Sequence, residues 1–458
     1  MVVVLIVIGS SLAACSSSSK KAVVPTTAGA TGSTVSTASS GSSASSVPLT
    51  ASFRGVTATA IKVGIVTIDY SCIKQFVDYN FGDQPAIDKV FIDDLNAHGG
   101  ILGRTIDPVY KSYCPIGNTQ ALALCTSFTE DAKVFAVLGV FIDFTGDAQL
   151  CLSRDHQTIH IGHELQQSWI GQAPPALMMT TDISAERRST VLLNLLKAQG
   201  TLTGKKVATL ADQDSASSVT KAIKPALDAM GVQQGSAAVV TVTGTDTSAG
   251  QSQLDSFIEK WKGEGVNAVI LAGLLMASKQ WVEKIKSQMP NVLLITDGVS
   301  SAQQAGQDET TAGKKPNPYD GMLTANGLSD SEQWQSAGLK KCVATYEAAG
   351  GPTVIGPDDL KPGPDGKRVL TWAAVRDFCG ELEMFSQIAT KAGPNLTNDT
   401  WTQAANNFGE ISLAAAAFAS IHTGKYDADD GFRLVAFDST TGSKGDFKPV
   451  TPIQDASK

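Results

Sequence analysis

The chain has 458 residues and a formal net charge of −8. A single hydrophobic core rarely organises more than about 300 residues, so this length predicts at least two folded lobes. The acidic balance and the lack of any Lys- and Arg-rich run argue against nucleic acid or an anionic membrane surface as the partner.

The chain begins with an apolar run at residues 2–8, followed by Leu12-Ala13-Ala14-Cys15 and a run of serines. This order is typical of a bacterial lipoprotein signal. The apolar run is far shorter than the ~20 residues that span a bilayer. We therefore predict a signal peptide over residues 1–14 and lipidation of Cys15. No Lys or Arg precedes the run, so we expect an upstream start codon or a truncated apolar leader.

Residues 15–59 are rich in Ser, Thr, Ala and Gly and contain few large apolar side chains. Such a segment cannot bury enough apolar surface to offset the entropy of ordering it. We predict a disordered tether that holds the folded body at the outer face of the cytoplasmic membrane, in an extracellular or periplasmic location.

From residue 60 onward, apolar β-rich runs alternate with segments of helical periodicity. In the first helical segment Ile87, Phe91 and Leu95 share one face, and Gly99-Gly100 provides its stop. The first set of strands is predicted at residues 61–68, 104–111, 134–140 and 158–161, with helices near residues 84–98, 119–130 and 146–154.

The alternation then repeats, which predicts a second parallel sheet. The fold class is therefore α/β, with two doubly wound lobes that have helices on both faces of each sheet. The second set of strands is predicted at residues 205–210, 237–242, 267–272 and 292–296, with helices near residues 217–230, 251–263 and 277–288.

Six of the seven cysteines remain if Cys15 carries lipid. An even number in an oxidising compartment favours disulfides, and no C-x-x-C motif indicates a redox or zinc site. Proximity along the chain suggests three pairs: Cys72–Cys151, Cys114–Cys125 and Cys342–Cys379.

Three segments in the first lobe carry a specific resemblance: residues 61–66 (IKVGIV), 81–84 (FGDQ) and 95–104 (LNAHGGILGR). They are similar to the opening of the leucine/isoleucine/valine-binding family. These are type I periplasmic binding proteins, the extracytoplasmic receptors of ABC importers. The likeness extends over residues 61–458, mainly in the order and length of the elements.

The resemblance implies two lobes joined by a hinge that the chain crosses three times. Residues 322–325 and 422–424 resemble the second and third crossings, and residues 356–367 form a surface insertion. The implied domain limits are residues 60–182 and 326–422 for lobe one, and residues 183–325 and 423–458 for lobe two.

In this family, a ligand carboxylate is held at a helix start in lobe one and an ammonium by a carboxylate in lobe two. The matching positions are Thr145 and Gly146 for the carboxylate and Asp297 for the ammonium. Each could equally serve as a core, turn or cap residue. The further ligand-binding candidates are Tyr70, Phe81, Phe144, His163, Glu164, Asp212, Gln213 and Leu274.

Asp155, His156, His160 and His163 invite a metal interpretation, but His160 and His163 point to opposite faces of a predicted strand. We therefore predict no metal and no cofactor. Linear motifs of serine hydrolases, phosphate-binding loops, dinucleotide sites and zinc peptidases are absent from the sequence.

The sequence thus predicts a monomeric, non-enzymatic solute-binding lipoprotein. It would capture an amino acid or a related amide or carboxylate and deliver it to the permease of an ABC importer. Two alternatives remain open: a receptor that signals to a membrane partner, and a hydrolase whose catalytic carboxylates lie in the cleft without a linear motif.

Overall fold

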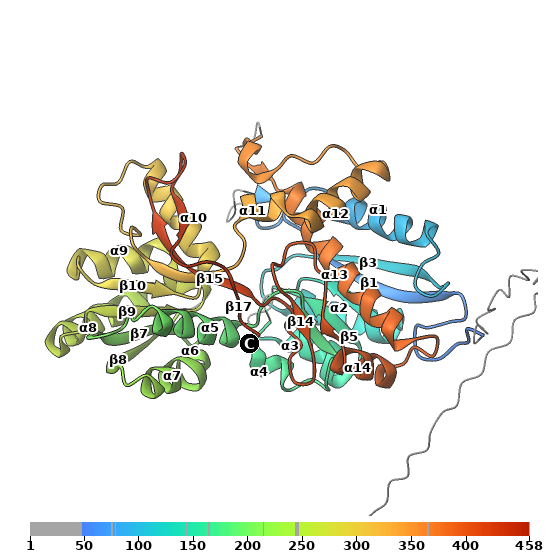
Figure 1. Cartoon of the computed structure of the whole chain (residues 1–458), viewed down its shortest axis with the longest axis horizontal. Helices are drawn as coiled ribbons and strands as arrows, with labels where there is room; N and C mark the ends of the chain where they lie inside the picture. The colour runs from blue at the N-terminus through green and yellow to red at the C-terminus, as the bar shows by residue number, and fades with distance from the viewer. Residues whose placement is uncertain are drawn as a thin grey trace, which may run out of the picture. The chain divides into compact units, whose positions relative to one another are not determined.

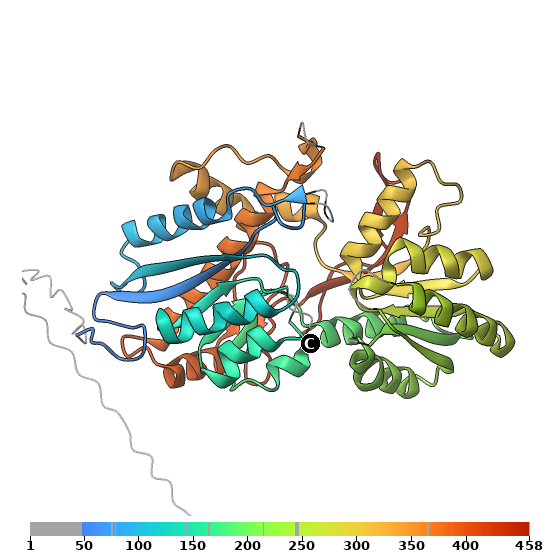
Figure 2. The same cartoon turned by 180° about the vertical axis from the view of Figure 1, so that it is seen from behind.

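The computed structural model describes residues 48–457, except for 75–76, 78, 143–144, 164, 214, 243–246 and 364–365. The predicted signal peptide, Cys15 and most of the tether lie outside these residues. Residues 47–458 form one compact unit. The unit contains two bodies, each built around its own sheet, which we call lobe one and lobe two (Figures 1 and 2).

Lobe one contains a five-stranded sheet in the order β3-β1-β4-β5-β6, and every neighbouring pair is parallel. Both faces of β1 are buried: Val63 and Ile65 pack into one core, and Val66 and Ile68 into another. Burial on both faces explains the continuous apolar run of this strand. The strands are β1 (Ala60–Ile68), β3 (Thr105–Tyr113), β4 (Ala136–Gly139), β5 (Ile159–Gly162) and β6 (Met178–Thr180).

Helices cover both faces of this sheet. The core that contains Phe91 and Phe385 joins one face to α1, α12, α13 and α14, whereas Leu124 and Leu152 lie in the core on the opposite face. The helices of lobe one are α1 (Gln84–Ala97), α2 (Thr119–Thr126), α3 (Asp147–Leu150), α4 (Gln167–Ile170), α11 (Asp330–Gln335), α12 (Ala337–Ala348), α13 (Thr371–Ala392) and α14 (Asn398–Asn406). Short π-helical turns at Ser127–Asp131 and Cys151–Asp155 extend α2 and α3, as the longer predicted helices require.

Lobe two contains a sheet in the order β16-β15-β11-β10-β9-β7-β8, with β17 (Gln454–Asp455) paired to β15. The strands from β8 to β11 are parallel, and β15 and β16 add an antiparallel edge. The strands are β7 (Lys206–Asp212), β8 (Gln233–Val240), β9 (Ala268–Ala272), β10 (Leu293–Thr296), β11 (Leu323–Asn326), β15 (Gly431–Asp438) and β16 (Asp446–Pro449).

The two faces of this second sheet are also covered by helices. Leu192 of α5 and Leu227 of α7 pack on one face, and Trp261 of α8 and Trp281 of α9 pack on the other. The helices of lobe two are α5 (Ala185–Ala198), α6 (Ala216–Ser218), α7 (Lys224–Ala229), α8 (Ser248–Glu264), α9 (Lys279–Gln288) and α10 (Val299–Thr311). In the part of the chain that the structure describes, no helix is both long enough and apolar enough to cross a membrane.

The chain passes between the two sheets three times. The first crossing joins β6 to α5, and the other two differ from those predicted. Of the predicted residues 322–325, Leu323 to Ala325 lie in β11 of the second sheet, so the crossing follows this strand. Residues 422–424 form a tight turn, in which the Lys425 N–H donates to the His422 carbonyl at 2.9 Å. The chain then still pairs with β6, because the Ala428 N–H donates to the Thr180 carbonyl at 2.9 Å. The third crossing therefore begins after Ala428, several residues later than predicted.

The disulfides correct two predicted pairs, Cys72–Cys151 and Cys114–Cys125. The structure joins Cys72 to Cys114 and Cys125 to Cys151. Strand β3 lies beside β1, so Cys114 at the end of β3 is next to Cys72, which follows β1. The third bond joins Cys342 of α12 to Cys379 of α13, the pair that proximity favours.

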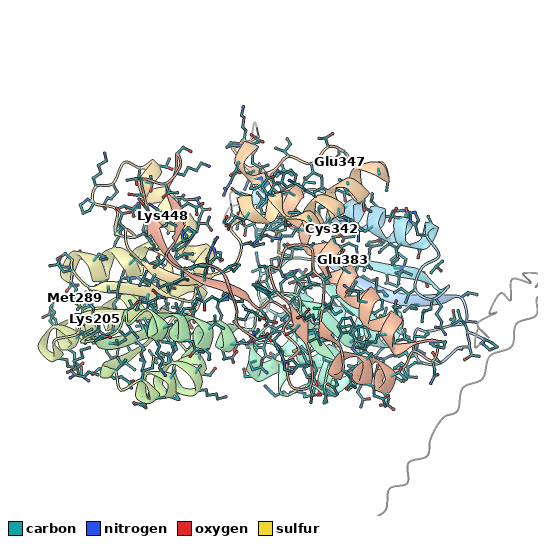
Figure 3. All side chains as sticks on the ribbon, in the orientation of Figure 1. Lys205, Met289, Cys342, Glu347, Glu383 and Lys448 are labelled. Carbon is teal, nitrogen blue, oxygen red and sulfur yellow. A yellow bond between two sulfur atoms is a disulfide. The ribbon has the colours of Figure 1, made fainter. Side chains whose placement is uncertain are left out.

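Glu383 lies one turn of α13 beyond Cys379 and has its carboxylate near that bond, beside Cys342 (Figure 3). The Cys342–Cys379 bond links α12 to α13 on the face of lobe one that also carries α1.

The described residues of the predicted insertion, 356–363 and 366–367, form a surface loop that ends beside the segment after β1. After it, β12 (Arg368–Val369) pairs in parallel with β2 (Tyr79–Asn80), and the Lys367 ammonium donates to the Val77 carbonyl at 2.7 Å. Arg368 also donates to the side chain of Gln304 in α10 at 3.2 Å. Strand β12, which follows the loop, therefore contacts both β2 of lobe one and α10 of lobe two.

Non-reducing peptide mapping by mass spectrometry should recover a Cys72–Cys114 peptide and a Cys125–Cys151 peptide, because the sheet order brings these residues together. A reduced digest serves as the control, in which both linked peptides should disappear. Recovery of a Cys72–Cys151 or Cys114–Cys125 peptide would contradict the structure.

Candidate functional site

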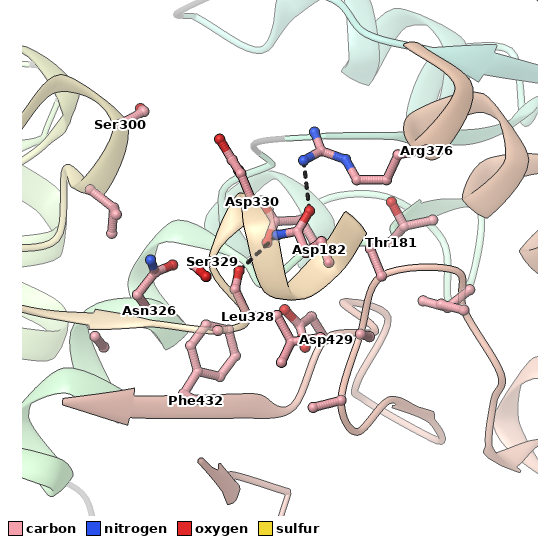
Figure 4. A pocket seen from close by; sticks show the side chains of 18 of the residues that line it. Thr181, Asp182, Ser300, Asn326, Leu328, Ser329, Asp330, Arg376, Asp429 and Phe432 are labelled. Atoms are coloured by element: carbon pink, nitrogen blue, oxygen red, sulfur yellow. Dashed lines mark hydrogen bonds between the residues drawn. The ribbon is translucent and has the colours of Figure 1, made fainter. Parts of the chain in front are cut away.

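A cavity of about 300 Å³ lies where the crossings meet α10 and α13 (Figure 4). This volume is at the lower end of the range for small-molecule pockets. Lobe two contributes Ser300 and Gln303 from the first turns of α10, and lobe one contributes Arg376 and Asp377 from α13. The crossings supply the remaining polar wall, which includes Thr181, Asp182, Asn326, Ser329, Asp330 and Asp429.

Hydrogen bonds fix one wall of this cavity. Ser329 caps α11 through a capping box with Glu332. Within α11, the Gln333 side chain donates to the Leu328 carbonyl at 2.8 Å and accepts from Arg376 at 2.8 Å, as the dashed lines in Figure 4 show. The capped helix therefore holds the guanidinium of Arg376 in place.

The cationic groups at the cavity all have a carboxylate partner. Three of the pairs lie within one lobe or join a lobe to its adjoining crossing, whereas Arg433 of β15 and Glu332 of α11 pair between the two lobes. The pairs are Arg376–Asp377 at 2.7 Å, Arg188–Asp182 at 3.0 Å, His163–Glu381 at 3.1 Å and Arg433–Glu332.

Asp429 differs from those carboxylates, because no cation lies within ion-pair distance of its side chain in the described part of the chain. One carboxylate oxygen accepts the Gly431 N–H at 3.0 Å. Burial, together with the nearby charges of Asp182 and Asp430, raises the pKa of Asp429 to about 8. The carboxyl group of Asp429 is therefore largely protonated at neutral pH.

Among the described ligand candidates, His163 alone lines this cavity. The Thr145 hydroxyl donates to Asp147 at 2.8 Å, and a side chain at Gly146 would collide with the Trp169 ring. Asp297 accepts from the Ser189 hydroxyl at 2.6 Å and from the Gly273 N–H at 2.7 Å, so it ties β9 and β10 to α5. Phe144, Glu164 and the side chain of Leu274 lie outside the described residues.

Tyr70 lines a second cavity of about 410 Å³, which lies entirely in lobe one at the ends of β1 and β3. Phe81 packs against Tyr70 with ring centroids 5.3 Å apart.

Asp212 and Gln213 cap backbone turns in lobe two. Asp212 accepts the Ser215 N–H at 2.7 Å, and Gln213 accepts the Val242 N–H at 3.0 Å. The cavity between the lobes is lined by none of the four candidates Tyr70, Phe81, Asp212 and Gln213.

The residues that dominate the cavity were not among the predicted ligand-binding candidates. Arg376 and Asp377 belong to a long helix, and Asp429 belongs to a crossing, so neither position follows a strand of the predicted sheets. The one local signal was the acidic run Asp427-Ala-Asp-Asp430, which is unusual next to an apolar strand.

The histidines that were considered for a metal site lie in different surroundings. His160 is buried with one ring nitrogen 3.2 Å from the Gly139 carbonyl, and burial lowers its pKa to about 4. His156 lies 3.8 Å from Glu130 on another part of lobe one.

His163 carries a charge that depends on its neighbours. Burial lowers its pKa, but contact with Glu381 and the charge of Asp377 outweigh burial and raise the pKa to about 9. An unfolded histidine titrates near ~6.5. The charged imidazole therefore stabilises the fold fully below pH ~6.5, and this contribution is lost as the pH rises through 9.

Replacement of this histidine, His163→Gln, should lower the free energy of unfolding most strongly near pH 6, by at most about 3 kcal/mol. The difference from the wild type should shrink between pH 6.5 and pH 9.5, as measured by urea unfolding at several pH values. A difference that stays constant over this range would argue against a charged His163.

A family model described as "Periplasmic binding protein" matches residues 89–353 of the chain. Among solved structures, a solute binding protein of an ABC transporter from Rhodopseudomonas palustris BisB5, in complex with 3,4-dihydroxybenzoic acid, is similar at 14% identity and a TM-score of 0.57. The alignment covers 87% of this chain and 98% of that one.

An ABC transporter substrate-binding protein from Desulfitobacterium hafniense, in complex with Leu, gives 14% identity and a TM-score of 0.55, with 85% and 100% covered. A fatty acid ABC transporter substrate-binding protein from Thermomonospora curvata gives 16% and 0.55, with 88% and 94% covered. No curated protein matches the chain. The structural likenesses show the fold, and the family match extends over more than half of the chain, which therefore belongs to the periplasmic binding protein family.

Proposed function

We propose that this protein captures one small polar solute in the cavity between its lobes and delivers it to an ABC importer. The carrying observation is that lobe one, lobe two and the crossings all contribute polar side chains to one cavity. A ligand stabilises a closed arrangement only as far as it binds that arrangement more tightly than the open one. Contacts to both lobes are the means to this, and they require no catalytic group.

The similar solved structures support the proposed class of ligand. One is a complex with a dihydroxybenzoic acid, one is a complex with leucine and one belongs to a fatty acid transporter, so all three concern small molecules. The protein acts as a monomer in this proposal, and an amino acid or a related amide or carboxylate is the first class to test. A lipid on Cys15 and the following tether hold it at the outer face of the cytoplasmic membrane.

A bulky side chain at the cavity should weaken solute binding. Ser300 is exposed and lines the cavity in the first turn of α10, so Ser300→Trp should weaken the affinity for the captured solute by at least about tenfold. Native mass spectrometry of the purified protein identifies any solute that copurifies, and calorimetry measures its affinity.

The matched control is Ser287→Trp, which places the same side chain on the exposed surface of α9, away from the cavity. Its affinity should equal that of the wild type. Unchanged binding in Ser300→Trp would show that the solute binds elsewhere.

The anchor can be tested separately. Cys15→Ala should remove the acceptor for the lipid, so the protein should move from the membrane fraction to the soluble fraction of the producing cells. Incorporation of a labelled fatty acid into the wild type, but not into the variant, provides the direct readout. Equal labelling of both proteins would exclude Cys15 as the lipidated residue.

A further inference from the structure

The charges at the cavity between the lobes do not balance. Each of its four cationic side chains is already neutralised by a carboxylate. Asp429 and Asp330 also line the cavity, and neither is ion-paired in the described part of the chain. A ligand therefore meets more acidic groups than cationic ones at this cavity.

Asp429 is held in position through its backbone. Its carbonyl accepts from the Arg187 guanidinium at 2.9 Å, and its N–H faces the Asp182 carbonyl at 3.4 Å. Among the described residues, one carboxylate oxygen accepts a hydrogen bond, from the Gly431 N–H. The residue lies beside Leu328 and Phe432 at the cavity (Figure 4). Apolar neighbours lower the local dielectric, which strengthens attraction to a cation that replaces the lost water.

We propose that the ligand is an organic cation with a net positive charge, such as a diamine, a guanidino compound or a basic amino acid, and that its charged nitrogen pairs with Asp429. This inference rests on the proposed function and narrows its ligand class. Asp330, which is exposed at the cavity, favours a second positive group on the same ligand. A plain carboxylic acid would instead add a negative charge to an acidic site.

The inference predicts a pH dependence. Burial and the charges of Asp182 and Asp430 keep the carboxyl of Asp429 protonated below pH ~8, whereas the Gly431 N–H and Arg188 favour its ionised form. Pairing with a cation requires the carboxylate, so binding releases a proton. The affinity should therefore rise by up to about tenfold per pH unit from pH 6 to 8, and level off above that.

Calorimetry with four probes tests the ligand class: 1,5-diaminopentane, arginine, leucine and 4-hydroxybenzoate. The two cationic probes should bind to the purified protein, and Asp429→Asn should weaken their affinity at least tenfold and flatten the pH dependence. Asp107→Asn makes the same charge change on the exposed part of β3 and should leave binding unchanged. Titrations of the wild type in buffers of different ionisation enthalpy measure the released proton, so the test stands even if Asp429→Asn does not fold.

The outcomes separate this inference from the proposed function. Binding of leucine or 4-hydroxybenzoate, without binding of the cationic probes, would overturn the cation inference and leave solute capture intact. Cationic binding that is indifferent to Asp429→Asn would overturn the assigned residue. If none of the probes binds, the cation inference fails, while a copurified solute in native mass spectrometry would still support solute capture.

Discussion

A buried network of charges at the hinge fixes how the two sheets are connected. Arg187 of α5 contacts Asp427 and Asp430, both almost fully buried, and Lys425 lies 3.1 Å from Asp430. The Asp427 carboxylate also accepts the N–H of Ser184 at 2.8 Å. Removal of one partner from such a buried pair typically costs about 3–5 kcal/mol, because the other charge is left without compensation. The first and third crossings are therefore locked together at the point where the chain leaves lobe one.

The same network places the acidic end of the cavity. Asp429 lies between the two buried aspartates, and Arg187 binds its carbonyl rather than its carboxylate. The guanidinium of Arg187 contacts Asp427, Asp430 and the Asp429 carbonyl. The side chain of Asp429 therefore has no ion-pair partner of its own in the described structure. Hinge stability and ligand electrostatics thus both depend on the short segment from Asp427 to Asp430. The strong ion pairs hold the backbone still, and the unpaired carboxylate faces the cavity.

Much of the fold could be predicted from sequence because strands buried on both faces are continuous apolar runs. The run at residues 61–68 differs from β1, Ala60–Ile68, by one residue. Two of the disulfide predictions were wrong, because distance along the chain does not reveal that β3 returns beside β1. The prediction of the cavity residues was wrong for a similar reason. The predicted site lay at strand ends, yet Arg376 lies on a long helix and Asp429 on a crossing whose position only the tertiary fold defines.

Family membership fixes the scaffold, whereas the charges of the cavity select the ligand. The solved relatives named with a dihydroxybenzoic acid and with leucine share at most about one residue in seven with this chain, so side chains in the cavity are free to differ. In this chain Arg376 already pairs with Asp377 at 2.7 Å and Arg188 with Asp182 at 3.0 Å, so an anionic ligand would have to share each guanidinium with a carboxylate. The proposed cation would instead pair with the carboxylate of Asp429, which has no ion-pair partner among the described residues, so the charges of the cavity favour a cationic ligand over an anionic one.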